Sequence, residues 1–392
     1  MRTVKITGIA AIALIVAFAA CKKSNTNSSN TTPPDECTIT KGSNDGDTVA
    51  GRYIIAYNPG GMNRSASRTD LSRASEDILQ RNAIASTALQ DVFGGEPGGF
   101  IATLNANEVV RLKADPMVQT IEHDRVVALS TCFTVVEPRS ITWNVNRVGY
   151  GDGRGKTAWI IDTGIDMTHP DLTVDATRSR SFLSGQTSPN DENGHGTHVA
   201  GIIGANNNSI GVLGVASGAT LISLRVLDKD GKGLESSIIQ ALAYVNTNAA
   251  AGDVVNMSLG DDSTTSAILD QQVQNTAARG IYIAIAAGND HQPADKFSPG
   301  NANGPNIFTV SAIDSLDRFA SFSNYGNDVV DYAAPGVRIV STFFAGRYAM
   351  MSGTSMAAPH VAGLLLLKGR NLNTSGYALN DPDGQPDPIA HY

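Results

Sequence analysis

Short apolar segments, each bounded by glycine, aspartate or asparagine, recur from residue 157 onward. They read TAWIID, TLISLRVLD, GDVVNMSLG, IYIAIAAGN, IFTVSAID and VDYAAPG, and segments with helical spacing such as HGTHVAGIIGA and LESSIIQALAYVNTNAA lie between several of them. Apolar strands that alternate with helices are typical of a parallel sheet covered by helices on both faces. We therefore expect an α/β domain over residues 139–376, with its functional groups at the carboxyl ends of the strands.

A second folded region is predicted upstream, over residues 50–130. RYIIAY, GGFIATL and VQTIEHDRVVAL indicate strands, whereas DLSRASEDILQRNAIASTAL and NANEVVRLKAD have helical spacing. Asn105, followed three residues later by Glu108, is a capping-box pattern at the start of the second helix. This order of strands and helices predicts a small α+β sandwich. Residues 377–392, rich in Asp and Pro, are expected to form a short C-terminal tail.

The first residues have the pattern of a secretory signal. Arg2 and Lys5 precede the apolar run GIAAIALIVAFAA, which is too short to span a bilayer comfortably. Two alanines then precede Cys21, which resembles a bacterial lipobox, in which the cysteine is lipidated. We expect residues 1–20 to be removed, Cys21 to carry the lipid, and residues 21–49 to form a flexible tether. Ordinary signal cleavage, with the cysteine unmodified, is the alternative.

Composition excludes some functions and leaves others open. The 392 residues carry a net charge of −8, so no basic surface argues for nucleic-acid binding. We expect a monomer in the bacterial cell envelope, facing the periplasm or the surface and held to the membrane only by its lipid, or a protein secreted after maturation. Cys37 and Cys132 could pair in an oxidising compartment. The chain has no cysteine after residue 140, so that part must be stabilised by packing and bound ions.

Three residues of the α/β domain have types and positions suited to nucleophilic catalysis. Asp162 ends an apolar strand, His195 starts a helix after a glycine, and Ser355 starts another helix within SGTSMAAPHVAG. A serine needs a base to become a nucleophile, and the base needs a group that holds its tautomer. Each residue alone has an ordinary structural interpretation, as a turn or cap residue. Together the three supply the complete catalytic set.

The motifs DTGID, HGTHVAG and GTSMAAPHVAG resemble those of the subtilisin-like serine proteases, the subtilase family (peptidase S8), in its subtilisin and proteinase K branches. The order Asp, His, Ser is that family's own. The resemblance implies a subtilisin-like fold in which Asp162 orients the imidazole, His195 acts as general base and then acid, and Ser355 attacks the peptide carbonyl. IAAGND resembles the oxyanion-hole segment, which implies Asn289 and the Ser355 backbone N–H as donors.

The same resemblance implies residues that bind an extended substrate. NMSLG resembles the strand that pairs with the peptide, and DKDGKGLES resembles the opposite strand. The implied binding residues are Ser258, Leu259, Gly260, Gly231, Gly233 and Glu235. Glu235 stands where the family often has a bulky residue at the pocket rim. Strand addition supplies affinity through backbone hydrogen bonds, and side-chain pockets add selectivity.

ANNNSIGVLGVA resembles the calcium loop of the family, with a further ligand from HPDL. The implied ligands are Asp171 and the Asn208 side chain together with the carbonyls of Asn206, Ile210 and Val212. An all-oxygen set suits Ca2+. We therefore expect a structural Ca2+ and no organic cofactor, with an Asn-rich turn that ends a helix as the alternative.

Residues 50–130 resemble the inhibitor I9-type propeptide of these proteases, chiefly through RYIIAY and VQTIEHDRVV. The implied protein is a self-processed zymogen that hydrolyses peptides or proteins, with a small ferredoxin-like propeptide as its intramolecular inhibitor. The propeptide assists folding and occupies the active site until cleavage between about residues 128 and 140. A stable accessory domain that is never removed is the alternative.

Other classes of protein fit the sequence less well. A zinc hydrolase could use His195 and His198, but HEXXH is absent and no third ligand is evident. An α/β-hydrolase needs Gly-x-Ser-x-Gly, whereas Ala357 replaces the last glycine here. A surface-tethered binding protein, with the fold retained but inhibited, remains the non-enzymatic alternative. Around the serine, we expect Ser352 in a turn and His360 packed in the core.

Overall fold

The computed structural model describes residues 46–58, 66–128, 132–135, 141–260 and 264–392, all within one compact unit that spans Glu36–Tyr392. The predicted signal sequence, Cys21 and Cys37 lie outside the described residues, so the lipid anchor and the Cys37–Cys132 bridge stay predictions. Within the ranges given above, no helix has the length and apolar character needed to cross a bilayer.

Nine strands form the main sheet, in the spatial order β18-β19-β15-β14-β13-β12-β7-β10-β8. Neighbouring strands run parallel, except that β18 and β19 are antiparallel. The strands are β7 (Thr157–Asp162), β8 (Arg180–Ser181), β10 (Thr220–Arg225), β12 (Val254–Met257), β13 (Tyr282–Ala286), β14 (Ile307–Ile313), β15 (Val330–Pro335), β18 (Asn373–Tyr377) and β19 (Pro388–His391). The predicted α/β class is therefore confirmed.

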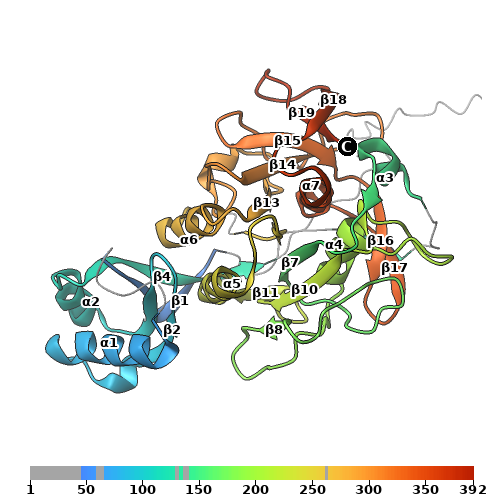
Figure 1. Cartoon of the computed structure of the whole chain (residues 1–392). Helices are drawn as coiled ribbons and strands as arrows, with labels where there is room; N and C mark the ends of the chain where they lie inside the picture. Colours follow the sequence, from blue (N-terminus) through green and yellow to red (C-terminus); the bar gives the residue numbers. More distant parts are fainter. Residues whose placement is uncertain (1–45, 59–65, 129–131, 136–140, 261–263) are drawn as a thin grey trace, which may run out of the picture. The chain divides into compact units, whose positions relative to one another are not determined.

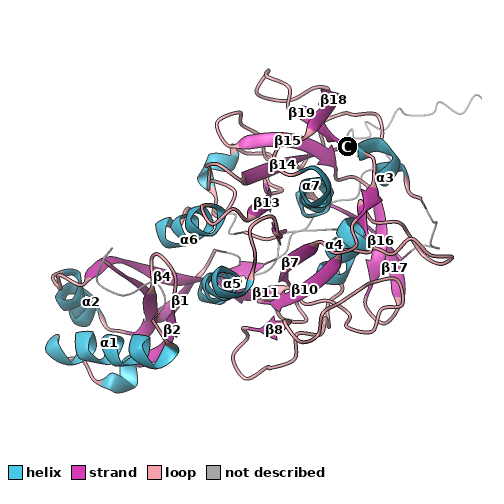
Figure 2. Ribbon diagram, viewed as in Figure 1, coloured by secondary structure: helices cyan, strands magenta, loops and turns pink. Residues whose placement is uncertain are grey.

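Helices cover both faces of this sheet, as Figures 1 and 2 show. On β7, Ala158 and Ile160 belong to one buried apolar cluster, whereas Trp159 and Ile161 belong to a second. The first cluster contains side chains of α4 and α7, and the second contains side chains of α5 and α6. These helices are α4 (His195–Gly204), α5 (Glu235–Asn248), α6 (Ala267–Ala277) and α7 (Thr354–Lys368). Because successive strand residues point to opposite faces, strands buried on both sides are apolar throughout.

Smaller elements complete this part of the chain, which we call the main subdomain (residues 132–135 and 141–392). Helix α3 (Trp143–Val148) precedes the sheet, and β6 (Gly151–Asp152) pairs with β9 (Ala216–Ser217). A three-stranded antiparallel sheet has the order β16-β17-β5, formed by β16 (Ile339–Phe343), β17 (Arg347–Ser352) and β5 (Cys132–Val135).

Residues 48–128, the upstream subdomain, have the element order β-α-β-β-α-β typical of ferredoxin-like folds. The elements are β1 (Thr48–Tyr57), α1 (Arg68–Arg81), β2 (Leu89–Phe93), β3 (Gly99–Thr103), α2 (Ala106–Lys113) and β4 (Val118–Ala128). The strands form an antiparallel sheet in the order β4-β1-β3-β2. The capping box of Asn105 and Glu108 is present at the start of α2.

Sequence periodicity overextended the first helix of this subdomain and missed β2. Helix α1 ends at Arg81, where the side-chain amide of Asn82 donates to the carbonyl of Ile78 at 2.8 Å. Ala83 then has a φ of 54°, a left-handed conformation that leaves the helix. The chain can therefore turn back, and Leu89–Phe93 pairs with β3.

The C-terminal residues are part of the main sheet rather than a separate tail. Strand β19 pairs with β15 through Ala333 and Ile389, and β18 pairs with β19. Arg147 binds the side chain of Asp317 and the carbonyl of Ser375, which holds this hairpin to α3. The predicted boundary at residue 377 therefore falls at the end of β18, inside this hairpin. Pairing to the sheet edge has no counterpart in local periodicity.

Candidate active site

Asp162 and His195 form a directly hydrogen-bonded pair at the carboxyl end of β7. The Nδ1 atom of His195 lies 2.8 Å from Oδ1 and 3.0 Å from Oδ2 of Asp162, and both residues are fully buried. A carboxylate only accepts hydrogen bonds, so the imidazole proton lies on Nδ1 and a lone pair lies on Nε2. The Nε2 atom is buried and has no hydrogen-bond partner among the described residues. The imidazole is thus held in the tautomer of a general base.

Two features bring the start of α4 against the end of β7. The backbone N–H of Gly196 donates to Thr163 Oγ1 at 2.9 Å. A Cβ on Gly196 would lie 2.1 Å from the carbonyl oxygen of Gly164, so a larger residue would push the helix away. Gly196, which follows His195 in the sequence, therefore allows the close approach that the hydrogen bond from His195 to Asp162 requires.

Asp191 holds the first turn of α4 and was not predicted from the sequence. Its carboxylate accepts five hydrogen bonds of 2.6–3.0 Å, from Asn193 N, Gly194 N, Thr197 N, Thr197 Oγ1 and Thr163 Oγ1. Burial raises the pKa of Asp191, whereas the hydrogen bonds from Thr197 and the backbone oppose that shift. Anionic groups are stabilised at helix N-termini. An aspartate shortly before the histidine, in DENGH, was the signal that could have identified it.

Ser355 lies in the first turn of α7, and it is only 4% exposed. Its Oγ donates to the carbonyl of Ser258 at 3.3 Å, and the Ser258 hydroxyl donates to the carbonyl of Ser355 at 2.8 Å. Within the described residues, Nε2 of His195 has no hydrogen-bond partner, so no hydrogen bond joins it to Ser355. The serine hydroxyl is therefore turned towards the strand end at Ser258.

Pro359 is the sixth residue of α7. Proline lacks the N–H that would bond the carbonyl four residues earlier, which is that of Ser355. The hydroxyl of Ser258 supplies the missing donor. A substrate-strand residue and the helix that carries Ser355 are thereby joined.

The other two polar residues of SGTSMAAPHVAG have structural partners. Ser352 ends β17 instead of lying in a turn, and its hydroxyl accepts the Arg338 N–H at 2.8 Å. The Nδ1–H of His360 donates to the Met356 carbonyl at 2.8 Å, and its Nε2 accepts from Asn144. Burial lowers the pKa of His360 to about 4. His360 is fully buried, as expected of a histidine packed in the core.

Asn289 lies beside the start of α7. Its Oδ1 accepts the Thr354 N–H at 2.9 Å and the Thr354 hydroxyl at 3.1 Å. The Thr354 hydroxyl also accepts the N–H of Gly288 at 3.1 Å. Because the amide oxygen is held by the residue before Ser355, the NH2 end of Asn289 is the end able to donate to a substrate oxygen.

Of the two predicted substrate strands, one is paired with a neighbouring strand and the other is not. Strand β11 (Lys232–Leu234) pairs antiparallel with the end of β4, with Gly233 opposite Val127. A Cβ on Gly233 would lie 2.1 Å from the carbonyl of Val226, so this strand needs glycine to lie against its neighbour. Gly231 has a φ of 73° in the preceding turn. The second predicted strand consists of Ser258, Leu259 and Gly260. These residues follow β12 directly and do not belong to a paired strand.

Glu235 does not lie at an open pocket rim in this structure. It is 2% exposed at the start of α5, and its carboxylate is hydrogen-bonded to the hydroxyl of Ser266. The same hydroxyl contacts Glu122 of β4 at 2.7 Å. The upstream subdomain therefore covers this position.

The predicted calcium ligands are brought together around Asp171. Its buried carboxylate accepts hydrogen bonds from Asn208 Nδ2 at 2.9 Å, from the Val212 N–H at 2.9 Å and from the Tyr348 hydroxyl at 3.2 Å. Asn206 donates its N–H to the Asp171 carbonyl, and Ile210 lies in the same loop. Burial raises the pKa of Asp171. The residue types present could supply only oxygen ligands, which suits Ca2+. In this structure, however, the Asn208 side chain presents Nδ2 to Asp171, and its Oδ1 accepts the Ile210 N–H at 2.9 Å.

The zinc alternative has no support in the described part of the chain. The Nε2–H of His198 donates to the carbonyls of Ile339 and Ala349, at 3.0 and 3.2 Å. Burial lowers the pKa of His198 to about 3. The described residues contain no group of three or more His, Cys, Asp or Glu arranged to hold a metal ion. The Asp171 loop is not such a group, because it has one carboxylate.

This chain is similar in sequence and in structure to known serine proteases. The model of the subtilase family matches residues 153–379. An alkaline serine protease of Corniculantispora psalliotae is 34% identical over 337 residues, which are 81% of this chain and 79% of that protein. Alkaline serine exoprotease A of Vibrio alginolyticus is 34% identical over 333 residues, and the match spans 81% of this chain but only 60% of that protein. A solved structure of a cold adapted subtilisin-like serine proteinase has a TM-score of 0.57 at 34% identity and covers 64% of this chain and 98% of its own.

Proposed function

Because this chain belongs to the subtilase family of serine proteases, we propose that Asp162, His195 and Ser355 hydrolyse peptide bonds through an acyl-enzyme. The observation that carries the proposal is the His195 Nδ1–Asp162 contact, which leaves a buried lone pair on Nε2. The Ser355 hydroxyl turns from the Ser258 carbonyl to this lone pair and transfers its proton as Oγ bonds to the substrate carbonyl carbon. The imidazolium then gives that proton to the leaving amine. In the second half of the reaction, His195 takes a proton from water, the water attacks the acyl-enzyme, and the imidazolium returns the proton to Ser355 as the carboxylic acid leaves.

The negative oxygen of the tetrahedral intermediate is stabilised by two donors. One is the side-chain amide of Asn289, whose oxygen is anchored on Thr354, and the other is the backbone N–H of Ser355 at the start of α7. Donors that are oriented before the reaction cost no reorganisation when charge develops. Loss of one such donor lowers kcat by about 10²–10³ in this family.

The upstream subdomain is an inhibitory propeptide of the I9 type. Two observations support this role: β4 pairs with β11, where substrate is expected, and Val127 belongs to a buried cluster with Leu259. The strand Ser258–Gly260 would pair with the other edge of a bound peptide. The mature enzyme would thus hold substrate between these two strands, with Glu235 exposed at a distal subsite once the propeptide leaves.

Two acids of β4 attach the propeptide to the starts of two helices. Asp124 accepts the N–H and hydroxyl of Ser236, at 3.1 and 2.6 Å, at the start of α5. Glu122 accepts the hydroxyl of Ser266 and the N–H of Ala267, at 2.7 and 3.1 Å, at the start of α6. Carboxylates stabilise helix N-termini through the helix dipole and free N–H groups. These contacts explain how the propeptide is held without a covalent bond after cleavage.

Self-cleavage falls within residues 129–131. On one side Ala128 pairs with Lys232 of β11, and on the other Cys132 pairs with Ser352, three residues before Ser355. Cleavage here is before Cys132, so a Cys37–Cys132 bridge would keep the released propeptide attached. Without the bridge, dissociation or proteolysis of the cleaved propeptide frees the active site.

Asp171, the Asn208 side chain and the carbonyls of Asn206, Ile210 and Val212 would hold a structural calcium ion. Its charge would neutralise the buried carboxylate of Asp171, and the shared ligands would join the loop after α4 to the segment around Asp171. The protein acts as a monomer, either anchored in the bacterial envelope through lipidated Cys21 or secreted after maturation.

One experiment tests the protease assignment. The chain is expressed without residues 1–21, alongside a Ser355→Ala variant. Wild type should cut itself within 129–131, lose activity to a serine-directed phosphonyl reagent and keep it in the presence of a zinc chelator. Peptidase activity in Ser355→Ala would refute the proposed nucleophile, whereas an intact, inert wild type would favour the inhibited binding protein.

A further inference from the structure

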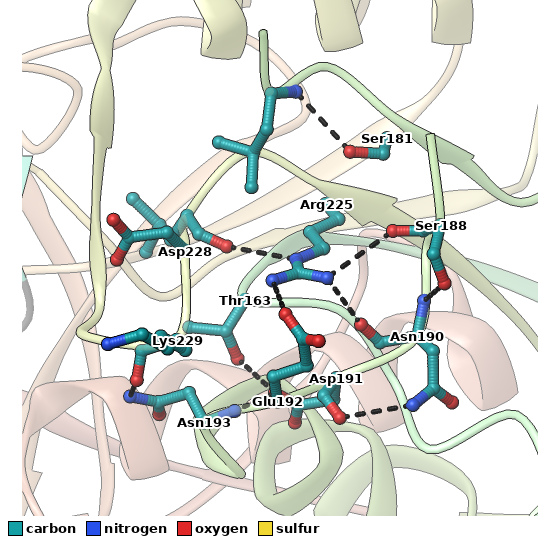
Figure 3. Close-up of polar contacts among 12 residues, drawn as sticks. Thr163, Ser181, Ser188, Asn190, Asp191, Glu192, Asn193, Arg225, Asp228 and Lys229 are labelled. Atoms are coloured by element: carbon teal, nitrogen blue, oxygen red, sulfur yellow. Dashed lines mark hydrogen bonds and ion pairs between the residues drawn. The ribbon is translucent and has the colours of Figure 1, made fainter. Parts of the chain in front are cut away.

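Arg225 is a buried cation at the end of β10 that the proposed mechanism does not use. It lies opposite Asp162 in the register of the parallel strands β10 and β7, and its side chain is 2% exposed. Figure 3 shows its guanidinium reaching into the segment that precedes α4. A buried arginine is rare unless its donors are satisfied, so its partners indicate what it does.

The guanidinium binds this segment on both sides of Asp191. Nη1 donates to the carbonyl of Asn190 at 2.9 Å and to that of Ser188 at 3.4 Å, and Nη2 donates to Oε2 of Glu192 at 2.6 Å. Nε donates to the carbonyl of Leu227 at 3.3 Å, so each of the three guanidinium nitrogens has an acceptor. The residues before and after Asp191 are therefore attached to one planar group.

Asp191 connects this segment to α4, the helix that begins with His195. Its carboxylate bonds the N–H groups of Gly194 and Thr197, on either side of the histidine. It also accepts the hydroxyl of Thr163, the residue that follows Asp162. A continuous set of contacts thus runs from Arg225 through Asp191 to both members of the Asp162–His195 pair.

We propose that Arg225 is a positioning residue for His195: by clamping residues 188–192 it fixes Asp191, and Asp191 fixes the imidazole against Asp162. This inference rests on the proposed function, in which His195 is the general base. Arginine suits the role because its five donors have a rigid planar fork, whereas lysine is a point charge on a flexible stem. Glu192, half exposed, balances the buried charge.

The test compares Arg225→Met with Arg225→Lys and with a matched control, Arg147→Met. Arg147 also binds a carboxylate and a backbone carbonyl, but at the C-terminal hairpin. We expect Arg225→Met to lower kcat by about 10²-fold with little change in KM, since a displaced catalytic group costs about that much. Arg225→Lys should restore part of kcat. Arg147→Met should lower thermal stability and leave kcat unchanged.

A second readout does not depend on activity. In the Ser355→Ala protein, the Nδ1 proton of His195 should give a far-downfield NMR resonance because it is held by Asp162. We expect this resonance to broaden or disappear in Arg225→Met and to persist in Arg147→Met. Glu192→Gln, which keeps the buried arginine, serves if Arg225→Met does not fold and should lower kcat less.

Unchanged kcat and an unchanged His195 resonance in the Arg225 variants, with only a loss of thermal stability, would overturn the inference. The same result in Arg225→Lys and Glu192→Gln would overturn it if Arg225→Met is unfolded. Activity that survives in Ser355→Ala would instead count against the proposed function. The resonance would still report on Arg225 in that case.

Discussion

The carbonyl of Ser355 is the point at which the catalytic helix depends on a neighbouring strand. Pro359 removes its helical donor, and the hydroxyl of Ser258 replaces that donor at 2.8 Å while accepting Asn256 Nδ2 at 2.9 Å. Ser258 and Asn256 are fully buried. We therefore predict that the cost of Ser258→Ala depends on which residue occupies position 359.

The size of the effect follows from the groups left unpaired. Ser258→Ala leaves the Ser355 carbonyl and the Asn256 amide without this partner, and each unsatisfied buried group costs about 1–3 kcal/mol. We expect a loss of about 2–6 kcal/mol in the free energy of unfolding. Adding Pro359→Ala supplies a backbone N–H to the carbonyl, which should return about 1 kcal/mol, the typical net worth of a hydrogen bond.

Denaturant unfolding of the single and double variants measures this coupling in the inactive Ser355→Ala background, where self-digestion is absent. Ser217→Ala provides the control, because the Ser217 hydroxyl also donates to a carbonyl, that of Ala205, at 2.9 Å. Ser217→Ala and Pro359→Ala should be additive. Additivity of Ser258→Ala and Pro359→Ala as well would refute the link between the strand and the helix.

Three further predictions concern the propeptide, the calcium site and pH. Asp124→Ala removes the contacts to Ser236 and should weaken inhibition at least about 10-fold, measured as faster appearance of activity, whereas exposed Asp70→Ala should not. A calcium chelator should lower the unfolding temperature of wild type but not of Asp171→Asn; equal shifts would contradict a site at Asp171. Burial, with repulsion from Asp381, raises the pKa of Asp387 to about 7. The folded chain therefore holds the proton of Asp387 more tightly than the unfolded chain does. The free energy of unfolding falls as the pH rises from about 4 to about 7. Asp387→Asn should flatten the pH dependence of the unfolding temperature, and an unchanged slope would count against this account.

Local patterns predicted much of the architecture because they report on the immediate surroundings of each residue. Apolar runs on β7 and β12 predicted a sheet covered on both faces, since such strands have no solvent side. The capping box at Asn105 was equally local. The missed strand, Leu89–Phe93, is a short edge strand that pairs only with β3, and its five residues are too few to show a clear period. The hairpin of β18 and β19 depends on pairing with the distant strand β15, which leaves no periodic signal in the segment itself.

The sequence by itself determined which residues could do the chemistry: Asp162, His195 and Ser355 stand in short motifs whose glycines permit close backbone approach. Only the tertiary structure decided what supports them. Asp191 and Arg225 act through carboxylate and guanidinium contacts to backbone groups of other segments, and Ser258 bonds a carbonyl almost a hundred residues away. Glu235 was interpreted as a pocket-rim residue, and its contact with Ser266 beneath β4 is likewise invisible in local sequence. Hydrogen bonds between distant segments are set by how the chain packs, because any polar residue of the right length can form them once folding brings it there.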